Sequence, residues 1–331
     1  MTSPKRWVPY VVVALLTAGC SGQDPGAAHP ATRSPSGPVT SRVTSPTATD
    51  PGASDPAWVT GRVTTGSQPC GILGAAGHVW VSDYGNDDLV ALDPHTLHVG
   101  RSIPVGTSPC GLAFGAGSIW VEDFGSAEVT RVDATTMKVQ HTYQVGPSPY
   151  DVTFAAGAAW VTNYGDGTVS RVDAASGRVT VVKTGGTPIG IAPAGGLVWT
   201  GIGTGIAAID PASGRVVHRI STDASAGWTA YDGQRVWVNV GREVWVIDGA
   251  TGRVVGRHRT GPKPEDGSVV DGVTWVPDAN GSLRRYGAGV SSSPVSSGVG
   301  NPFVLAGYRG LVWVVDFTGT DVVRIDPSRV G

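Results

Sequence analysis

Short apolar runs along this chain are separated by glycine and polar turn residues, and the pattern recurs seven times. Each repeat centres on a tryptophan with an apolar neighbour, and successive tryptophans lie 38 to 40 residues apart. They are Trp80, Trp120, Trp160, Trp199, Trp237, Trp275 and Trp313. A period of about 40 residues with strand-like content is typical of a β-propeller, one four-stranded blade per repeat. The pattern therefore predicts an all-β fold of seven four-stranded blades.

The third repeat shows the content of one blade. Four β-rich runs, at about 149–155, 157–165, 167–173 and 177–182, are separated by glycine or Asx turns. Ala159, Trp160 and Val161 are apolar on consecutive positions. This favours a strand covered on both faces, as expected for a blade that packs between two neighbours.

The ends of the repeat array predict how the ring closes. The last repeat ends one strand short, and an isolated strand signal at about 58–64 precedes the first repeat. Pairing of the two would complete the last blade and remove two exposed sheet edges. We therefore expect deletion of residues 57–66 to destabilise the whole ring.

The first 56 residues predict export and tethering. Lys5 and Arg6 precede an apolar run that is too short for a comfortable membrane span, so residues 1–20 are predicted to be a signal peptide. The ending at Cys20 resembles a bacterial lipobox, although Thr17 replaces the usual leucine. This resemblance implies lipidation of Cys20 and a location on the outer face of the cell membrane; an ordinary secretory signal is the alternative.

Composition divides the rest of the chain and excludes some partners. Residues 21–56 are rich in Ser, Thr and Pro and are expected to form a disordered tether, which leaves 57–331 for the propeller. The net charge is −2, so no broad nucleic-acid-binding surface is expected. We expect the protein to be a monomer.

The repeat resembles a known family. Val161-Thr162-Asn163-Tyr164-Gly165, followed by the run from Val169 to Asp173, is similar to the YVTN-type (YncE-like) β-propeller repeat. The tryptophan in place of the first tyrosine also resembles the related streptogramin (virginiamycin B) lyases. By this resemblance, the innermost strand comes first in each repeat. The loop entering it and the loop between the second and third strands then share one face around the channel.

Two sets of residues fall on that face. The first lies three residues after each tryptophan and includes Asp83, Asp123, Asn163, Asp278 and Asp316, with an aromatic following in four cases (Tyr84, Phe124, Tyr164 and Phe317). These residues either close Asx turns and pack between blades, or form a site for a cation, sugar or peptide. Asp83, Asp123 and Asp316 are the candidate metal ligands.

The second set lies ten residues before each tryptophan and is expected to line the channel mouth. It comprises Cys70, Cys110, Tyr150, Ile189, Gly227 with Trp228 after it, Glu265 with Asp266 after it, and Phe303. Cys70 and Cys110 occupy equivalent positions in adjacent repeats, so a disulfide between blades one and two is expected if Cys20 is lipidated. Two free thiols or a soft-metal pair are the alternatives.

No histidine falls on a predicted inner strand or site loop, so a His-based acid–base pair or a Ser/His/Asp triad is not expected. We therefore predict a lipid-anchored binding or scaffold module for a protein, peptide or envelope glycan. The alternative is a metal-assisted lyase or hydrolase related to the streptogramin lyases, with Ca²⁺ or Mg²⁺ held by carboxylates. Glu122, Glu265 and Asp278 would then join Asp83, Asp123 and Asp316 as candidate ligands or bases.

Overall fold

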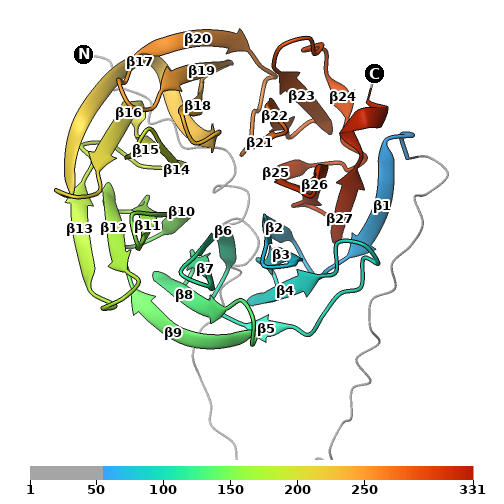
Figure 1. Ribbon diagram of the computed structural model, residues 1–331, viewed down its shortest axis with the longest axis horizontal. Coiled ribbons are helices and arrows are strands. Elements are labelled where there is room, and N and C mark those ends of the chain that lie inside the picture. The colour runs from blue at the N-terminus through green and yellow to red at the C-terminus, as the bar shows by residue number, and fades with distance from the viewer. Residues whose placement is uncertain (1–54, 331) are drawn as a thin grey trace, which may run out of the picture. The chain divides into compact units, whose positions relative to one another are not determined.

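The computed structural model describes residues 55–330, which fold as antiparallel β-sheets set around a central axis (Figure 1). The only helix among these residues is a short 3₁₀ turn, η1 (Pro327–Arg329). The predicted signal peptide, Cys20 and all but the last residues of the predicted tether lie outside the described residues. No helix within 55–330 is long and apolar enough to cross a membrane.

Three consecutive four-stranded sheets form blades one to three. Blade one contains β2 (Pro69–Ala75), β3 (His78–Asp83), β4 (Asp88–Leu92) and β5 (Ile103–Pro104). Blade two contains β6 (Pro109–Gly115), β7 (Ser118–Asp123), β8 (Glu128–Asp133) and β9 (Lys138–Gln144). Blade three contains β10 (Pro149–Ala155), β11 (Ala158–Asn163), β12 (Thr168–Asp173) and β13 (Val179–Lys183). In each, the first strand lies innermost (Figure 1).

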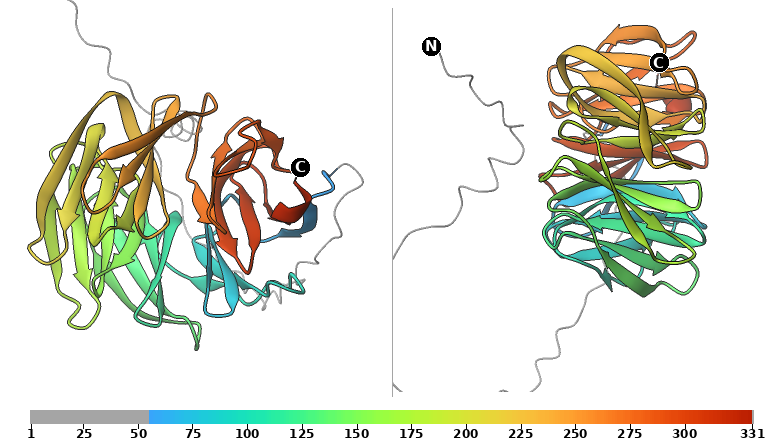
Figure 2. Two further views of the ribbon diagram at one scale, coloured as in Figure 1. Left: turned by 45° about the horizontal axis from the view of Figure 1, so that its top comes forward. Right: turned by 90° about the vertical axis from the view of Figure 1, so that its left-hand side faces the viewer.

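The next sheet has seven strands because two blades share one of them. It contains β14 (Ile191–Ala194), β15 (Leu197–Gly201), β16 (Gly203–Asp210), β17 (Arg215–Tyr231), β18 (Arg235–Val240), β19 (Glu243–Asp248) and β20 (Val254–Arg259). The 17-residue β17 pairs with β16 through its first part and with β18 through its last part. It is thus the outer strand of blade four and the inner strand of blade five (Figures 1 and 2).

Two further sheets complete the ring. Blade six contains β21 (Ser268–Val270), β22 (Val273–Asp278), β23 (Ser282–Tyr286) and β24 (Val295–Ser296). Blade seven contains β25 (Pro302–Tyr308), β26 (Leu311–Asp316), β27 (Asp321–Ile325) and, as its outer strand, β1 (Val59–Thr64). With β17 counted in both of its blades, the sheets correspond to the seven repeats of the sequence.

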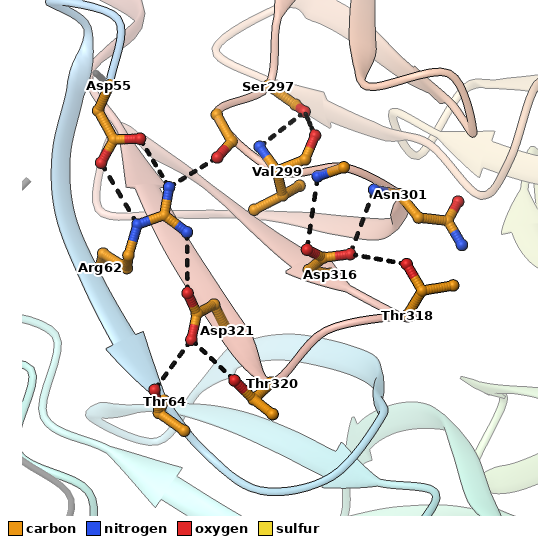
Figure 3. Close-up of polar contacts among 12 residues, drawn as sticks. Asp55, Arg62, Thr64, Ser297, Val299, Asn301, Asp316, Thr318, Thr320 and Asp321 are labelled. Atoms are coloured by element: carbon orange, nitrogen blue, oxygen red, sulfur yellow. Dashed lines mark hydrogen bonds and ion pairs between the residues drawn. The ribbon is translucent and has the colours of Figure 1, made fainter. Parts of the chain in front are cut away.

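The predicted ring closure is confirmed by the pairing of β1 with β27. Val63 lies opposite Val322 and Val59 opposite Ile325, and both valines of β1 are buried. Beside them, the Arg62 guanidinium donates to Asp55, to Asp321 and to the Gly298 carbonyl oxygen (Figure 3). Strands from the two ends of the propeller are therefore held together by both apolar and charged contacts.

The repeated tryptophan packs each blade against its neighbours. All seven tryptophans are buried, and the indole nitrogens of Trp80, Trp120 and Trp160 donate to a carbonyl oxygen five residues earlier. In four blades an arginine of the third strand lies over the indole ring with its guanidinium carbon 5.0 to 5.8 Å from the ring centroid. These contacts combine apolar burial with cation–π attraction.

The aspartates that end the third strands form turns. The Asp133 carboxylate accepts hydrogen bonds from the backbone N–H groups of Thr135 and Thr136, which lower its pKa. Such bonds satisfy backbone donors where the chain reverses between the third and fourth strands. The same arrangement recurs at Asp93, Asp173, Asp210, Asp248 and Asp326.

Candidate functional site: an aromatic face above a central cavity

Four inner strands begin with a β-bulge at the positions predicted to line the channel mouth. In β10, Pro149 pairs with Asn163 and Asp151 with Thr162, which leaves Tyr150 as an extra residue. The register of β2, β6 and β25 shifts at the equivalent point. A bulge changes the direction of the side chains beside it, so these strands break strict alternation just where the channel opens.

Cys70 and Cys110 form a disulfide at two of these bulges. Their Cα atoms lie 4.9 Å apart, and the bond joins the inner strands of blades one and two. Next to it, a Cβ atom on Gly71 would lie 1.9 Å from the carbonyl oxygen of Cys110. Glycine is therefore required here for the two inner strands to approach each other closely.

The aromatic residues of both predicted sets come together into one continuous group. Tyr150 contacts Trp228 and Tyr164, with ring centroids 5.2 and 5.5 Å apart, and also Phe124 at 6.1 Å. On its other side Trp228 contacts Phe303 at 5.6 Å. Phe303 contacts Phe317, which contacts Tyr84. We call the seven rings the aromatic face: Tyr84, Phe124, Tyr150, Tyr164, Trp228, Phe303 and Phe317.

The aromatic face joins five blades. Phe303 and Phe317 are buried, whereas Tyr84, Phe124, Tyr150, Tyr164 and Trp228 are half-buried. Such rings combine apolar contact area with the hydrogen-bonding groups of tyrosine and tryptophan, a composition typical of binding surfaces.

The polar members of the first set do not share this surface, because their side chains are turned into the blades. The Asp123 carboxylate accepts from the Gly106 N–H and the Thr130 hydroxyl, and Asn163 accepts from the Gly146 N–H in the same way. Asp278 and Asp316 accept from the loops that precede β21 and β25. Each side chain ties the end of a second strand to the loop that enters the first strand.

The candidate metal ligands Asp83, Asp123 and Asp316 therefore lie in three separate blades, each with its own local partners. Within residues 55–330, no group of three or more His, Cys, Asp or Glu side chains is placed to hold a metal ion. Burial raises the pKa of both Asp83 and Asp123 to about 7, and the neighbouring Asp88 contributes to the shift at Asp83. The environment of these carboxyls stabilises the protonated form.

The two glutamates considered as ligands are also buried. Burial raises the pKa of Glu265 to about 8, against the opposing effect of a hydrogen bond from Trp228. Burial likewise raises the pKa of Glu122 well above its usual range. Glu122 occupies the position of Ser82 and Thr162, whose hydroxyls donate to a carbonyl oxygen of the next blade. Glu122 instead accepts from the Gly111 N–H of its own blade, and its Oε1 has no hydrogen-bond partner among residues 55–330.

Two carboxyls lie below the aromatic face: Asp151, which the sequence reasoning missed, and Asp266, which it noted only as the residue after Glu265 in the mouth set. Asp151 and Asp266 each lie nine residues before a tryptophan, one position beyond the mouth set, and both line a central cavity of about 350 Å³. Tyr150 and Trp228 line the same cavity. The sequence did contain a signal for these two residues, because the residue nine before the tryptophan is uncharged in every other repeat. Those residues are Gly71, Gly111, Gly190, Trp228 and Val304.

Comparison with known proteins supports the fold. Neither the family models nor the curated protein sequences match the chain. Among solved structures, the virginiamycin B lyase of Staphylococcus aureus is similar with a TM-score of 0.67 and 14% identity, over 80% of this chain and 98% of that one. The Cps50 (Swd1) β-propeller domain of Myceliophteria thermophila is similar with a TM-score of 0.69 and 11% identity, over 81% of this chain and 98% of that one. BamB of Moraxella catarrhalis is similar with a TM-score of 0.58 and 12% identity, over 85% of this chain and 94% of that one.

At these identities the likeness shows that the chain is a β-propeller, and it does not extend to an activity.

Proposed function

We propose that this protein is a binding module whose aromatic face takes up a protein, peptide or envelope glycan. The observation that carries the proposal is the continuous contact of seven rings from five blades, five of them half-buried. Monomeric proteins rarely expose large joined apolar areas, and those that do often use them for binding. Both peptides and sugars pack favourably on tyrosine and tryptophan rings.

We further propose that the module belongs to the YVTN-type propellers and is held on the outer face of the cell membrane by a lipid on Cys20. The repeats around Trp160 and the residues before Cys20 support these two points. A tether of residues 21–56 would let one monomeric propeller reach partners near the membrane. Replacement of Cys20 by serine in the native host is expected to move the protein from the membrane to the soluble exported fraction, while fractionation unchanged by C20S would argue against the anchor.

Chemical cross-linking in the native envelope tests the proposed face. The variant Tyr84→Ala/Phe124→Ala/Tyr164→Ala removes three half-buried rings, and Trp228→Ala removes a fourth. The matched control is Val181→Ser/Val255→Ser, because these valines are about 60% exposed on the outer strands β13 and β20. The melting temperature of each variant is measured first.

We expect a cross-linked component that wild type and the valine control share and that the aromatic variants lose. Cross-links unchanged in the aromatic variants, or lost equally in the valine control, would refute the use of this face.

A further inference from the structure

The cavity between the inner strands has the size of a small-molecule site. Its volume is about 350 Å³, and inner strands of all seven blades contribute to its wall. Most of the wall is apolar, with Ile72, Leu112, Val152 and Leu305 as examples. Pockets of a few hundred cubic ångströms with apolar walls and a few converging polar groups are the usual form of ligand sites.

The charged groups that line this cavity are all acidic. Asp151 and Asp266 are part of the wall, and no lysine, arginine or histidine is among the described residues that form it. The Asp151 carboxylate is fixed by the backbone N–H groups of Val152 and Ile191, at 2.7 and 2.9 Å. The Asp266 carboxyl likewise accepts from the backbone N–H groups of Gly267 and Thr229, whereas its Oδ1 is buried and has no hydrogen-bond partner among residues 55–330. The cavity thus holds a buried acceptor that a donor could satisfy.

The two carboxyls interact with each other. Burial raises the pKa of Asp151 to about 7, and burial together with the negative charge of Asp151 raises the pKa of Asp266 well above its usual range. The other titratable groups that face them are Tyr150, Tyr231, Glu122 and Glu265, none of which carries a positive charge. The pair therefore retains a proton near neutral pH that a cation could replace.

Aromatic rings lie at both ends of the cavity wall. Tyr150 and Trp228 belong to the aromatic face at one end. At the other end of the same inner strands, Phe114 and Tyr231 line the cavity while 43% and 47% exposed. The negative faces of such rings attract organic cations.

We propose that the cavity binds a small organic ammonium ion with an apolar body, whose ammonium group lies between Asp151 and Asp266. The apolar body would pack against the aliphatic wall, and the ammonium N–H groups would donate to the carboxylates and satisfy Oδ1 of Asp266. A bare metal ion fits less well, because a hard cation takes six to eight oxygen ligands and Asp151 and Asp266 are the carboxylates among the described residues of this wall. The proposal is independent of the proposed function, which concerns the outer aromatic face.

Isothermal titration calorimetry on the full-length protein tests this site. The probes are benzylammonium and phenethylammonium, and benzyl alcohol is the neutral comparator for benzylammonium. We expect saturable binding of at least one ammonium probe, with benzyl alcohol binding about tenfold or more weakly because it brings no charge. Equal binding of the alcohol, or no saturable binding of any ammonium probe up to millimolar concentration, would overturn the proposal.

Variants locate the bound probe. Asp266→Asn and Asp151→Asn each remove a carboxyl that can become a carboxylate when the ammonium replaces the shared proton, and we expect about tenfold or more loss of affinity for the bound ammonium probe. Asp83→Asn is the matched control, since Asp83 is a buried carboxyl with a similarly raised pKa that lies outside the cavity. The affinity of Asp83→Asn for the ammonium probe should equal that of wild type. Unchanged affinity in both cavity variants, or equal loss in the control, would refute the assignment.

The pH dependence of wild type tests the site without any variant. Because the cation replaces a proton on the carboxyl pair, affinity is expected to fall between pH 8 and pH 6 as Asp151 becomes protonated. Binding heats in buffers of different ionisation enthalpy should show proton release near pH 7. Affinity that is independent of pH, with no proton release, would contradict the proposed contact with the carboxyls.

Discussion

The Cys70–Cys110 disulfide offers the sharpest test of how the ring is stabilised. The bond closes a segment with a sequence separation of 40, one whole blade repeat. In the chain-entropy description, a cross-link over about 40 residues lowers the entropy of the unfolded chain by roughly 13 cal/mol/K, which amounts to about 4 kcal/mol at 25 °C. We therefore expect Cys70→Ala/Cys110→Ala to lower the free energy of unfolding by up to about 4 kcal/mol.

The assay is equilibrium guanidinium denaturation of the full-length protein, followed by tryptophan fluorescence. The transition midpoint should fall in the double variant, and wild type treated with a reductant should show a similar fall. The untreated wild type should contain no reactive thiol at Cys70 or Cys110. A loss below about 1 kcal/mol in both the variant and the reduced protein would refute the argument that the cross-link acts by restricting the unfolded chain.

Three further predictions address closure, buried charge and strand approach. Arg62→Met should cost about 2 kcal/mol in denaturation experiments, because it removes charge-assisted hydrogen bonds from β1 to Asp321 of β27 and to Asp55. The control Arg235→Met affects a 55% exposed arginine 4.0 Å from Asp232 and should change stability by less than about 0.5 kcal/mol. Since the pKa of Asp83 is raised to about 7 in the folded protein, the folded state binds more protons than the unfolded state between about pH 4 and pH 7, and stability should fall as pH rises through that window. Asp83→Asn should flatten this dependence in melting curves at pH 5 and pH 8, and an unaltered slope would contradict the assignment. Gly71→Ala should lower the melting temperature markedly because its Cβ would collide with the Cys110 carbonyl oxygen, while Gly300→Ala, where the space is open, should have little effect.

The period of the tryptophans was enough to predict the blades, because every repeat must bury the same strand between two neighbours. The strand at 58–64 was also predictable, since pairing the unpaired strand edges at the two ends of the repeat array removes both of them at once. The continuous course of β17 was not predicted. In repeats one to three, a glycine followed three residues later by a proline marks the loop that enters the inner strand, as in Gly106 and Pro109. Residues 221–227 lack this loop signal, and β17 runs through them without a break.

The site was predictable in part. The aromatic residues were identified because they follow or precede each tryptophan at fixed spacing, and their contacts with one another follow from the ring. The neighbouring aspartates could not be assigned from spacing, since an acceptor for backbone N–H groups and a metal ligand have the same sequence pattern. Asp151 was missed because the bulge at Tyr150 breaks the alternation by which inward-facing positions are counted.

The single strand shared by blades four and five has a consequence for the way the folded protein fluctuates. Most blades continue into the next blade through a loop, so each can open without breaking the strand pairing of its neighbour. Blades four and five cannot separate in this way, because opening of β16–β17 pairs loosens the same strand that pairs with β18. Native-state hydrogen exchange should therefore group the amides of these two blades into one cooperative unit about twice the size of the others.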